Sequence, residues 1–240
     1  WRPFPESTLR VRASYKDIFR VPTFTDLYYL RMGNTNLKPE ETSQYNVGVT
    51  WSASCGDWLR HLAISVDGYY NTVKDKIVAL PTMYIWKMMN LGEVDIKGAD
   101  LNLSAQFPLP LRMELLLAST YSYQHAVDIT DPGAKNYKDQ IPYTPRHSGT
   151  VSVSLENPWV NVSYILTAVG DRYALPQNID RNRINSYMEQ SISLNKDFRF
   201  RHFGLRLQGE LLNLANVNYD VIQYYPMPGR SWRFSVCLSY

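Results

Sequence analysis

The last nine residues of the chain alternate strictly between apolar and polar side chains. The apolar or aromatic members are Trp232, Phe234, Val236, Leu238 and Tyr240. The residues between them are Arg233, Ser235, Cys237 and Ser239. Successive side chains of a β-strand point to opposite faces of the sheet, so this period of two predicts a strand with one apolar face and one polar face.

The same alternation recurs along the whole chain in segments that are each about one membrane-spanning strand long. It predicts nine further strands, at about 7–16, 44–53, 60–72, 95–107, 112–124, 147–155, 159–169, 187–196 and 205–211. A β-strand crosses a bilayer in about 9 to 11 residues. Helical periodicity is not sustained in any of these segments, so we expect a single all-β unit over residues 1–240.

The predicted connections are unequal in a regular way, because every second one is short. The short connections are 54–59, 108–111, 156–158 and 197–203, and the long ones are 17–43, 73–94, 125–146, 170–186 and 213–230. Outer-membrane barrels have short turns at one end and long loops at the other. The pattern therefore predicts an antiparallel up-and-down transmembrane β-barrel.

The mean hydropathy of -0.33 is low for a membrane protein, but it is compatible with a barrel. Only every second residue of a barrel strand must face lipid, so the average stays near neutral. Aromatic residues near the strand ends are expected to form the two interfacial girdles: Trp51, Trp58, Tyr69, Tyr70, Tyr121, Tyr123, Trp159 and Trp232. Charged residues expected on the inner face are Arg10, Arg12, Asp67, Arg206, Glu210 and Arg233.

Several function classes find no support in the sequence. The charge is nearly balanced, with 25 Lys+Arg against 22 Asp+Glu and no basic run, so we expect no nucleic acid as a partner. The two cysteines and four histidines match no metal-ligand spacing, and we predict neither a metal site nor a cofactor. No nucleophile elbow or phosphate-binding glycine motif has a convincing context, so we do not expect an enzyme.

Three segments of the chain carry motifs that are typical of one protein family. The first is a pair of boxes, Phe19-Arg20-Val21-Pro22 and Asn34-Thr35-Asn36-Leu37-Lys38-Pro39-Glu40. The second is Asn90-Leu91-Gly92 leading to Ile96-Lys97-Gly98-Ala99-Asp100-Leu101. The third is the ending, from Asn213-Leu214-Ala215-Asn216 through Pro228-Gly229-Arg230 to the terminal strand.

These three segments resemble TonB-dependent outer-membrane receptors. The resemblance implies a bacterial outer-membrane protein. The family barrel has twenty-two strands around an N-terminal plug, so the chain would be the C-terminal barrel portion, with the plug, the TonB-contacting segment and the first strands absent. It also implies contact with TonB through that plug, with membrane lipid, and with the barrel-assembly machinery, which would read the ending Trp232, Phe234, Val236, Leu238 and Tyr240. A partial barrel cannot satisfy its backbone in lipid, so we expect the fragment to need a partner at its edges.

For function, the resemblance implies import of a scarce nutrient such as an iron–siderophore or a cobalamin-type compound. Aromatic residues of the long loops are candidates for ligand contact, with loop packing as the alternative: Tyr28, Tyr29, Tyr84, Trp86, Tyr173, Tyr224 and Tyr225. Two other readings stay open, a soluble all-β carbohydrate-binding or other ligand-binding domain and a passive porin or adhesin barrel. The sequence leaves open the cargo, a companion lipoprotein, the oligomeric state and the closure of the edges.

Overall fold

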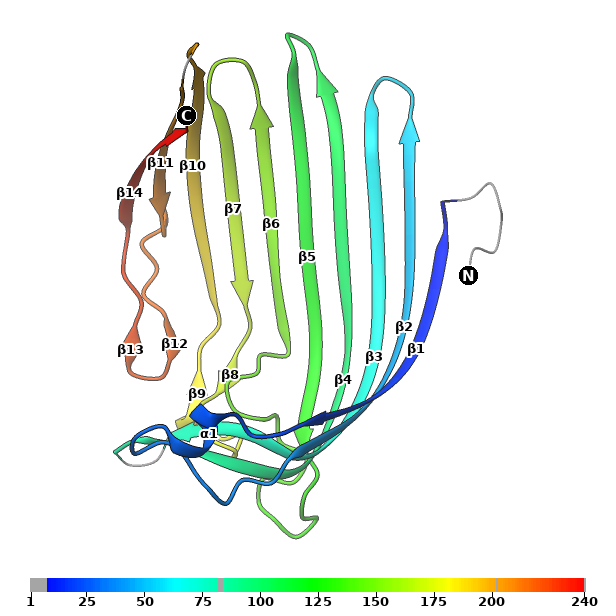
Figure 1. Cartoon of the computed structure of the whole chain (residues 1–240), viewed down its shortest axis with the longest axis vertical. Helices are drawn as coiled ribbons and strands as arrows, with labels where there is room; N and C mark the ends of the chain where they lie inside the picture. Colours follow the sequence, from blue (N-terminus) through cyan, green and yellow to red (C-terminus); the bar gives the residue numbers. More distant parts are fainter. Residues whose placement is uncertain (1–7, 82–83, 202, 240) are drawn as a thin grey trace.

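The computed structural model describes residues 8–81, 84–201 and 203–239. Tyr240 and the first residue of the strand predicted at 7–16 therefore lie outside the described residues. Ten antiparallel strands form one sheet in the order β1-β2-β3-β4-β5-β6-β7-β10-β11-β14 (Figure 1). Their bounds are β1 (Arg10–Arg20), β2 (Glu40–Cys55), β3 (Leu59–Pro81), β4 (Trp86–Leu109), β5 (Met113–Asp128), β6 (His147–Glu156), β7 (Asn161–Val169), β10 (Tyr187–Arg199), β11 (Gly204–Leu212) and β14 (Ser231–Ser239). The predicted ten-strand meander is confirmed.

The short turns gather at one end of the sheet and the longer connections at the other, as predicted (Figure 1). The long-loop end carries one short helix, α1 (Phe24–Tyr28), and a 3-10 turn, η1 (Asp180–Asn182). It also carries two small ribbons, in which β8 (Arg172–Tyr173) pairs with β9 (Arg183–Ile184), and β12 (Asp220–Ile222) pairs with β13 (Tyr225–Pro226). We expect ligand contacts at this end, because loops held by a rigid scaffold carry a disproportionate share of binding residues.

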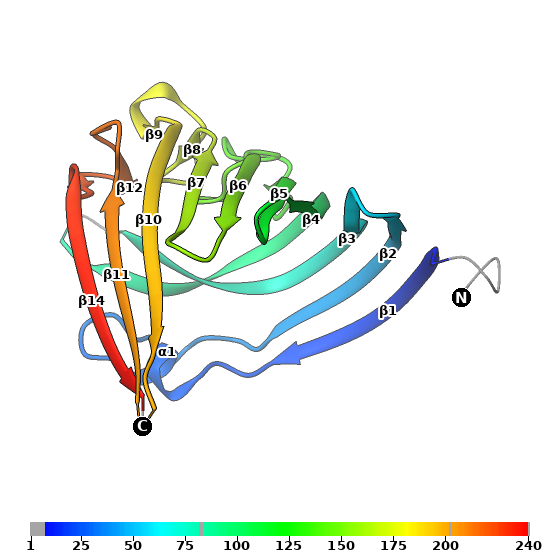
Figure 2. The ribbon, with the colours of Figure 1, turned by 90° about the horizontal axis from the view of Figure 1, so that it is seen from above.

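One predicted long loop is wrong. Residues 73–94 were expected to form a loop, but β3 and β4 continue as a paired hairpin to Pro81 and Trp86. The pairing continues because Val73, Val94 and Ile77 are covered by neighbouring loops, which rewards extended structure beyond the membrane-spanning length. The hairpin bends across the long-loop end of the sheet (Figures 1 and 2).

The main sheet is a single curved layer, whose end strands β1 and β14 are not hydrogen-bonded to each other in the described part of the chain (Figure 2). Strand register places Val49, Val66, Leu101 and Tyr121 side by side on one face. This face stays exposed, with 58% of Val47 and 78% of Phe234 accessible. The fold thus leaves an apolar belt that a water-soluble globule would bury.

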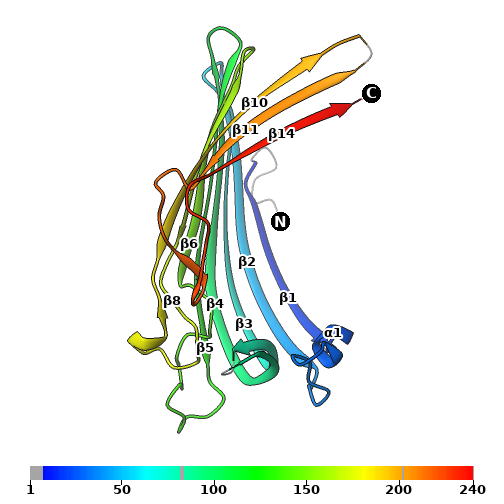
Figure 3. The same ribbon diagram turned by 90° about the vertical axis from the view of Figure 1, so that its left-hand side faces the viewer.

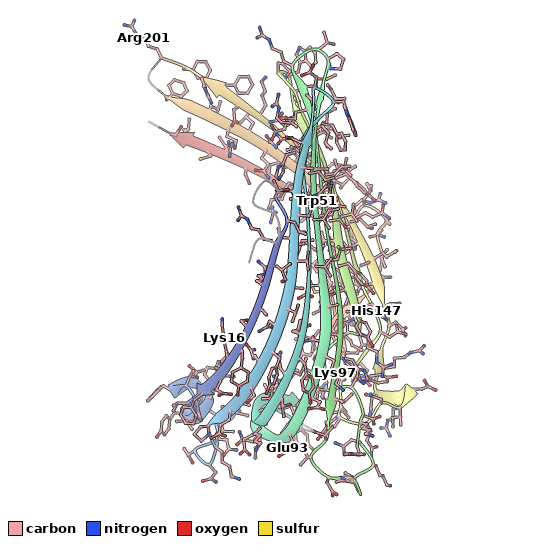
Figure 4. The ribbon with its side chains drawn as sticks, turned by 90° about the vertical axis from the view of Figure 1, so that its right-hand side faces the viewer. Lys16, Trp51, Glu93, Lys97, His147 and Arg201 are labelled. Atoms are coloured by element: carbon pink, nitrogen blue, oxygen red, sulfur yellow. The ribbon has the colours of Figure 1, made fainter. Side chains whose placement is uncertain are left out.

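Aromatic side chains border the apolar belt at both ends. Towards the long loops, Tyr15 lies 4.8 Å from Tyr45 and Tyr45 lies 6.3 Å from Tyr70, measured between ring centroids. Towards the short turns, the rings of Trp58 and Phe107 are 6.5 Å apart. Figure 4 shows Trp51 nearer the short-turn end and His147 nearer the long loops. The predicted girdles are therefore present on the apolar face.

Tyr69 was predicted in a girdle, and that prediction is wrong. Tyr69 precedes Tyr70 and so points to the opposite, polar face, where its ring lies over Gly98. A Cβ on Gly98 would lie 2.3 Å from the Tyr69 ring. The glycine therefore provides the space in which the ring packs.

The opposite face is polar and carries paired charges. Arg12 donates to Asp67 at 2.7 Å, Arg206 donates to Asp197 at 2.6 Å, and Arg233 donates to Glu210. The second and third pairs join neighbouring strands. The first pair joins β1 to β3 across β2. The charged residues predicted on the inner face thus share one face, and five of the six form ion pairs there.

The hydrophobic core lies under the long loops rather than between sheet layers. It consists of Val73, Val94, Ile96, Ala126 and Ile141, all of them buried. The remaining sheet has side chains projecting from both faces of one layer (Figure 4). At the short-turn end, β10, β11 and β14 lean away from the other strands (Figure 3).

Candidate functional site

The two family boxes form a brace at the base of the long loops. Arg20 donates to the Asp26 carboxylate at 3.1 Å and to Glu40 Oε2 at 3.5 Å. Glu40 Oε2 also accepts from the backbone N–H of Ile77 at 3.2 Å. The first box, the second box and the β3–β4 hairpin are thereby joined through one carboxylate.

Helix α1 is fixed in this brace by a capping box. The Asp26 N–H donates to Thr23 Oγ1 at 3.1 Å, and the Thr23 N–H donates to the Asp26 carboxylate at 2.9 Å. The backbone donor of Thr23, with smaller contributions from the Thr23 hydroxyl and Arg20, holds the pKa of Asp26 below its ordinary value although burial opposes this. Asp26 thus caps the helix and also binds Arg20 of the first box.

The second box is also bonded to the hairpin by side-chain amides. Asn34 Nδ2 donates to the Met88 carbonyl at 3.1 Å, while Asn90 accepts from the Lys38 N–H at 2.9 Å. Asn90 Nδ2 donates in turn to the carbonyls of Lys38 and Asp75 at 3.1 and 2.6 Å. The bonds to Met88 and Lys38 thus join the loop residues of the second box to the hairpin.

The other residues of the two boxes differ in how far they are buried. Leu37 is buried, Pro22 is half-buried, and Asn36 donates its N–H to Asn34 Oδ1 at 3.0 Å. Phe19 and Pro39 are exposed, with 61% of Phe19 accessible. The side-chain contacts of the boxes named above thus connect them to α1 and to the β3–β4 hairpin.

A pocket of 410 Å³ opens between the β3–β4 hairpin, the segment after β5, β8 and β12. Its lining is Val78, Ala79, Leu80, Trp86, Ile141, Pro142, Tyr143, Arg172, Val221 and Ile222. The Trp86 and Tyr143 ring centroids are 5.6 Å apart. The pocket combines aliphatic walls, two aromatic rings and one cationic side chain.

The seven aromatic candidates from the sequence do not form one cluster. Trp86 lines the pocket, and the Tyr173 carbonyl accepts from the Tyr143 N–H at 2.7 Å, behind the pocket wall. The other five are exposed: Tyr28 59%, Tyr29 58%, Tyr84 90%, Tyr224 82% and Tyr225 67%. Contact of the seven aromatic residues with a ligand stays a prediction.

Sequence reasoning missed Arg172, the charged residue of this pocket. It is only 3% exposed, and its Nη2 donates to the backbone carbonyls of Asp220 and of Val221, the latter at 3.2 Å. Burial lowers the pKa of Arg172 from its ordinary value. No spacing in the sequence distinguishes this arginine, because its neighbours come from four separate loops and hairpins.

A half-buried aromatic pair lies beside Arg172. The Tyr187 and Tyr219 rings stack with centroids 4.1 Å apart, and the Arg172 guanidinium lies 5.5 Å from the Tyr187 centroid. Tyr219 donates its hydroxyl proton to Glu189 at 3.1 Å. Burial, together with this bond to a carboxylate, raises the pKa of Tyr219 to about 12. The phenol therefore remains protonated at neutral pH.

No group of three or more His, Cys, Asp or Glu side chains is placed to hold a metal ion within residues 8–81, 84–201 and 203–239. Over the same residues, no helix has the length and apolar character needed to cross a bilayer.

The architecture by itself indicates the class of protein. A single antiparallel layer with an exposed apolar belt, aromatic borders, a charged opposite face and long loops at one end has the features of an outer-membrane β-barrel wall. The family described as "TonB dependent receptor-like, beta-barrel" matches residues 1–214. The chain belongs to this family, whose barrels lie in the outer membrane of Gram-negative bacteria.

A curated relative is the vitamin B12 transporter BtuB of Photobacterium profundum. It is 28% identical over 233 residues, which are 94% of this chain and 34% of the relative. The chain thus spans about a third of the length of this relative. The family comprises receptors and transporters, not enzymes.

Solved structures share the fold. The copper transporter OprC superposes with a TM-score of 0.73 at 17% identity, covering 99% of this chain and 38% of that protein. BauA, the ferric preacinetobactin receptor of Acinetobacter baumannii, gives a TM-score of 0.70 at 14% identity, covering 98% of this chain and 34% of that protein. The predicted architecture, a portion of an outer-membrane barrel, is therefore confirmed.

Proposed function

We propose that the full-length protein to which this chain belongs is an energy-coupled importer of a scarce nutrient. External loops capture the ligand, and TonB, acting on a plug domain outside residues 1–240, opens a path through the barrel. The observation that carries the proposal is family membership over residues 1–214, combined with loops braced around a pocket at the long-loop end.

We favour a cobalamin-type compound as the cargo, because the curated relative with 28% identity is named a vitamin B12 transporter. An iron–siderophore is the second candidate, since one structural neighbour is named a ferric preacinetobactin receptor. That neighbour is only 14% identical, so its likeness supports the fold more than the cargo.

In this proposal the seven aromatic loop residues contribute to ligand capture, five of them as exposed surface and Trp86 at the pocket. The terminal residues Trp232, Phe234, Val236 and Leu238 are all exposed on the apolar face of the end strand. This display supports their proposed role as the signal for the barrel-assembly machinery, with Tyr240 completing it.

Two alternative functions are weaker. A soluble carbohydrate-binding domain does not fit the exposed apolar belt, which water would not tolerate over ten strands. A passive porin or adhesin shares the barrel wall, and it differs from an importer in needing no TonB.

Uptake of radiolabelled cyanocobalamin tests the proposal. The full-length gene is expressed in a Gram-negative host that lacks its own cobalamin receptor, with and without functional TonB. We expect uptake only with TonB. Uptake without TonB would instead support a passive pore. Uptake of a ferric siderophore but not cobalamin would replace the favoured cargo and retain the import mechanism.

A further inference from the structure

The pocket beside the β3–β4 hairpin contains one cationic group among mainly apolar walls. Arg172 is only 3% exposed, and it lines the pocket together with Trp86 and Tyr143. A guanidinium in such surroundings is costly unless its donors are matched, because burial removes its hydration.

The hydrogen bonds of Arg172 are incomplete. Nη2 donates to the carbonyls of Asp220 and Val221, but Nη1 is buried without a hydrogen-bond partner among the described residues. Both of the acceptors that Arg172 has are neutral backbone groups. The guanidinium forms no ion pair within residues 8–81, 84–201 and 203–239.

The nearest acids do not complete the site. Asp171 accepts from the Ser186 N–H at 2.6 Å, and Asp220 accepts from the Tyr224 N–H at 3.1 Å. These bonds hold the two carboxylates on their own loops. The Tyr187 ring supports the guanidinium from another side, 5.5 Å from its centroid, but supplies no acceptor comparable to an oxyanion.

We propose that this pocket binds a carboxylate carried on a flat or apolar skeleton, with the carboxylate on Arg172 and the skeleton against Trp86 and Tyr143. Arginine presents planar paired donors that suit a carboxylate. A volume of 410 Å³ lies within the usual range for small-molecule pockets of about 300–1,000 Å³. The pocket would then hold a small ligand or one substituent of a larger cargo.

The enclosed position of Nη1 adds a mechanical consequence. Because Nη1 is buried, a carboxylate can reach it only after a wall of the pocket shifts, whereas the Nη2 bonds to the Asp220 and Val221 carbonyls can stay in place. Binding would therefore add one charged acceptor, on Nη1, to the two neutral backbone acceptors that Nη2 already has. A carboxylate site would give the proposed importer a class of ligand. Its role in the cell therefore rests on the proposed import function.

Direct binding to the purified full-length receptor tests the site without transport. Fluorine NMR measures binding of 4-fluorobenzoate, with 4-fluorobenzamide as the neutral probe of matched shape. We expect the benzoate to bind and the benzamide to bind at least tenfold more weakly. Arg172→Gln should weaken benzoate binding at least tenfold, whereas Arg183→Gln, an exposed arginine on the paired strand β9, should not change it.

A second variant separates loss of the site from loss of the loop fold, because Arg172→Gln also removes the bonds to β12. Ala79→Trp fills the pocket and leaves Arg172 in place, and it should abolish benzoate binding. Equal binding of both probes, or unchanged benzoate binding in either Arg172→Gln or Ala79→Trp, would overturn the proposal. Cobalamin uptake by a receptor that fails this test would leave the import function standing.

Discussion

Gly48 and Gly98 lie on the polar face at positions where a larger neighbour needs their space. A Cβ on Gly48 would lie 2.1 Å from the Asp67 carboxylate, which is paired with Arg12. A Cβ on Gly98 would lie 2.3 Å from the Tyr69 ring and 2.6 Å from the Tyr123 carbonyl. Each glycine thus permits a specific cross-strand packing, in one case an ion pair and in the other an aromatic ring.

We expect Gly98→Ala to destabilise the barrel by about 1–3 kcal/mol, a typical cost of forcing a methyl group into packed surroundings. The Tyr69 ring can move, but the Tyr123 carbonyl belongs to the adjacent strand and cannot. Urea unfolding of the full-length receptor in lipid vesicles measures the change. Gly68→Ala is the matched control, because its nearest atom would be 3.9 Å away. Equal destabilisation by both variants would contradict the explanation.

At the scale of elements, the boxes and the β3–β4 hairpin form one mechanical unit. Glu40 accepts from Arg20 on one side and from the Ile77 N–H on the other. Asn90 bonds to Lys38 and Asp75. Because the hairpin extends beyond the rest of the sheet, these polar bonds and the small apolar core fix its direction across the long-loop end.

We expect Glu40→Ala to loosen the hairpin, because the Ile77 N–H loses its acceptor and Arg20 loses one of its two carboxylates. Hydrogen exchange at the Ile77 amide of the full-length receptor should accelerate at least tenfold, which corresponds to about 1.4 kcal/mol. Glu41→Ala is the control, since Glu41 follows Glu40 and points to the other face. Exchange that is unchanged in Glu40→Ala, or equally fast in both variants, would refute the brace.

At the scale of the whole molecule, the sheet is one layer with two different surroundings. Its apolar face stays exposed in the isolated chain, while its polar face carries ion pairs such as Arg12 with Asp67. Bilayer on one side and an aqueous interior on the other satisfy both faces at once. In lipid the backbone groups of the end strands β1 and β14 need hydrogen-bond partners, and we propose that further strands of the full-length barrel supply them.

This arrangement predicts opposite outcomes for neighbouring substitutions on β4. Leu101 lies on the apolar face, so Leu101→Arg should cost about 2–4 kcal/mol in the full-length barrel if the site is near the bilayer centre. Asn102→Arg places the same charge on the polar face and should cost much less. Urea unfolding in vesicles measures both. A larger cost for Asn102→Arg would reverse the assignment of the two faces.

The sequence by itself determined the strands and their faces. The period of two in segments such as Trp232 to Leu238 is local, and register then follows because a slip of one residue would move every apolar side chain to the other face. The ends of the strands were less determined by the sequence. Within the predicted loop 73–94, β3 continues to Pro81 and β4 begins at Trp86, because residues distant in the sequence cover Val73 and Val94. The boxes identified the family, but not their role as a brace.

Only the tertiary structure decided the pocket. Trp86, Tyr143, Arg172 and Val221 come from segments far apart in the chain, and no local pattern reveals that their side chains converge. The incomplete hydrogen bonding of Arg172 is likewise invisible in the sequence, since it depends on which carbonyls reach the guanidinium after the loops pack. Alternation is a property of neighbours along the chain, whereas a binding site is a property of neighbours in space.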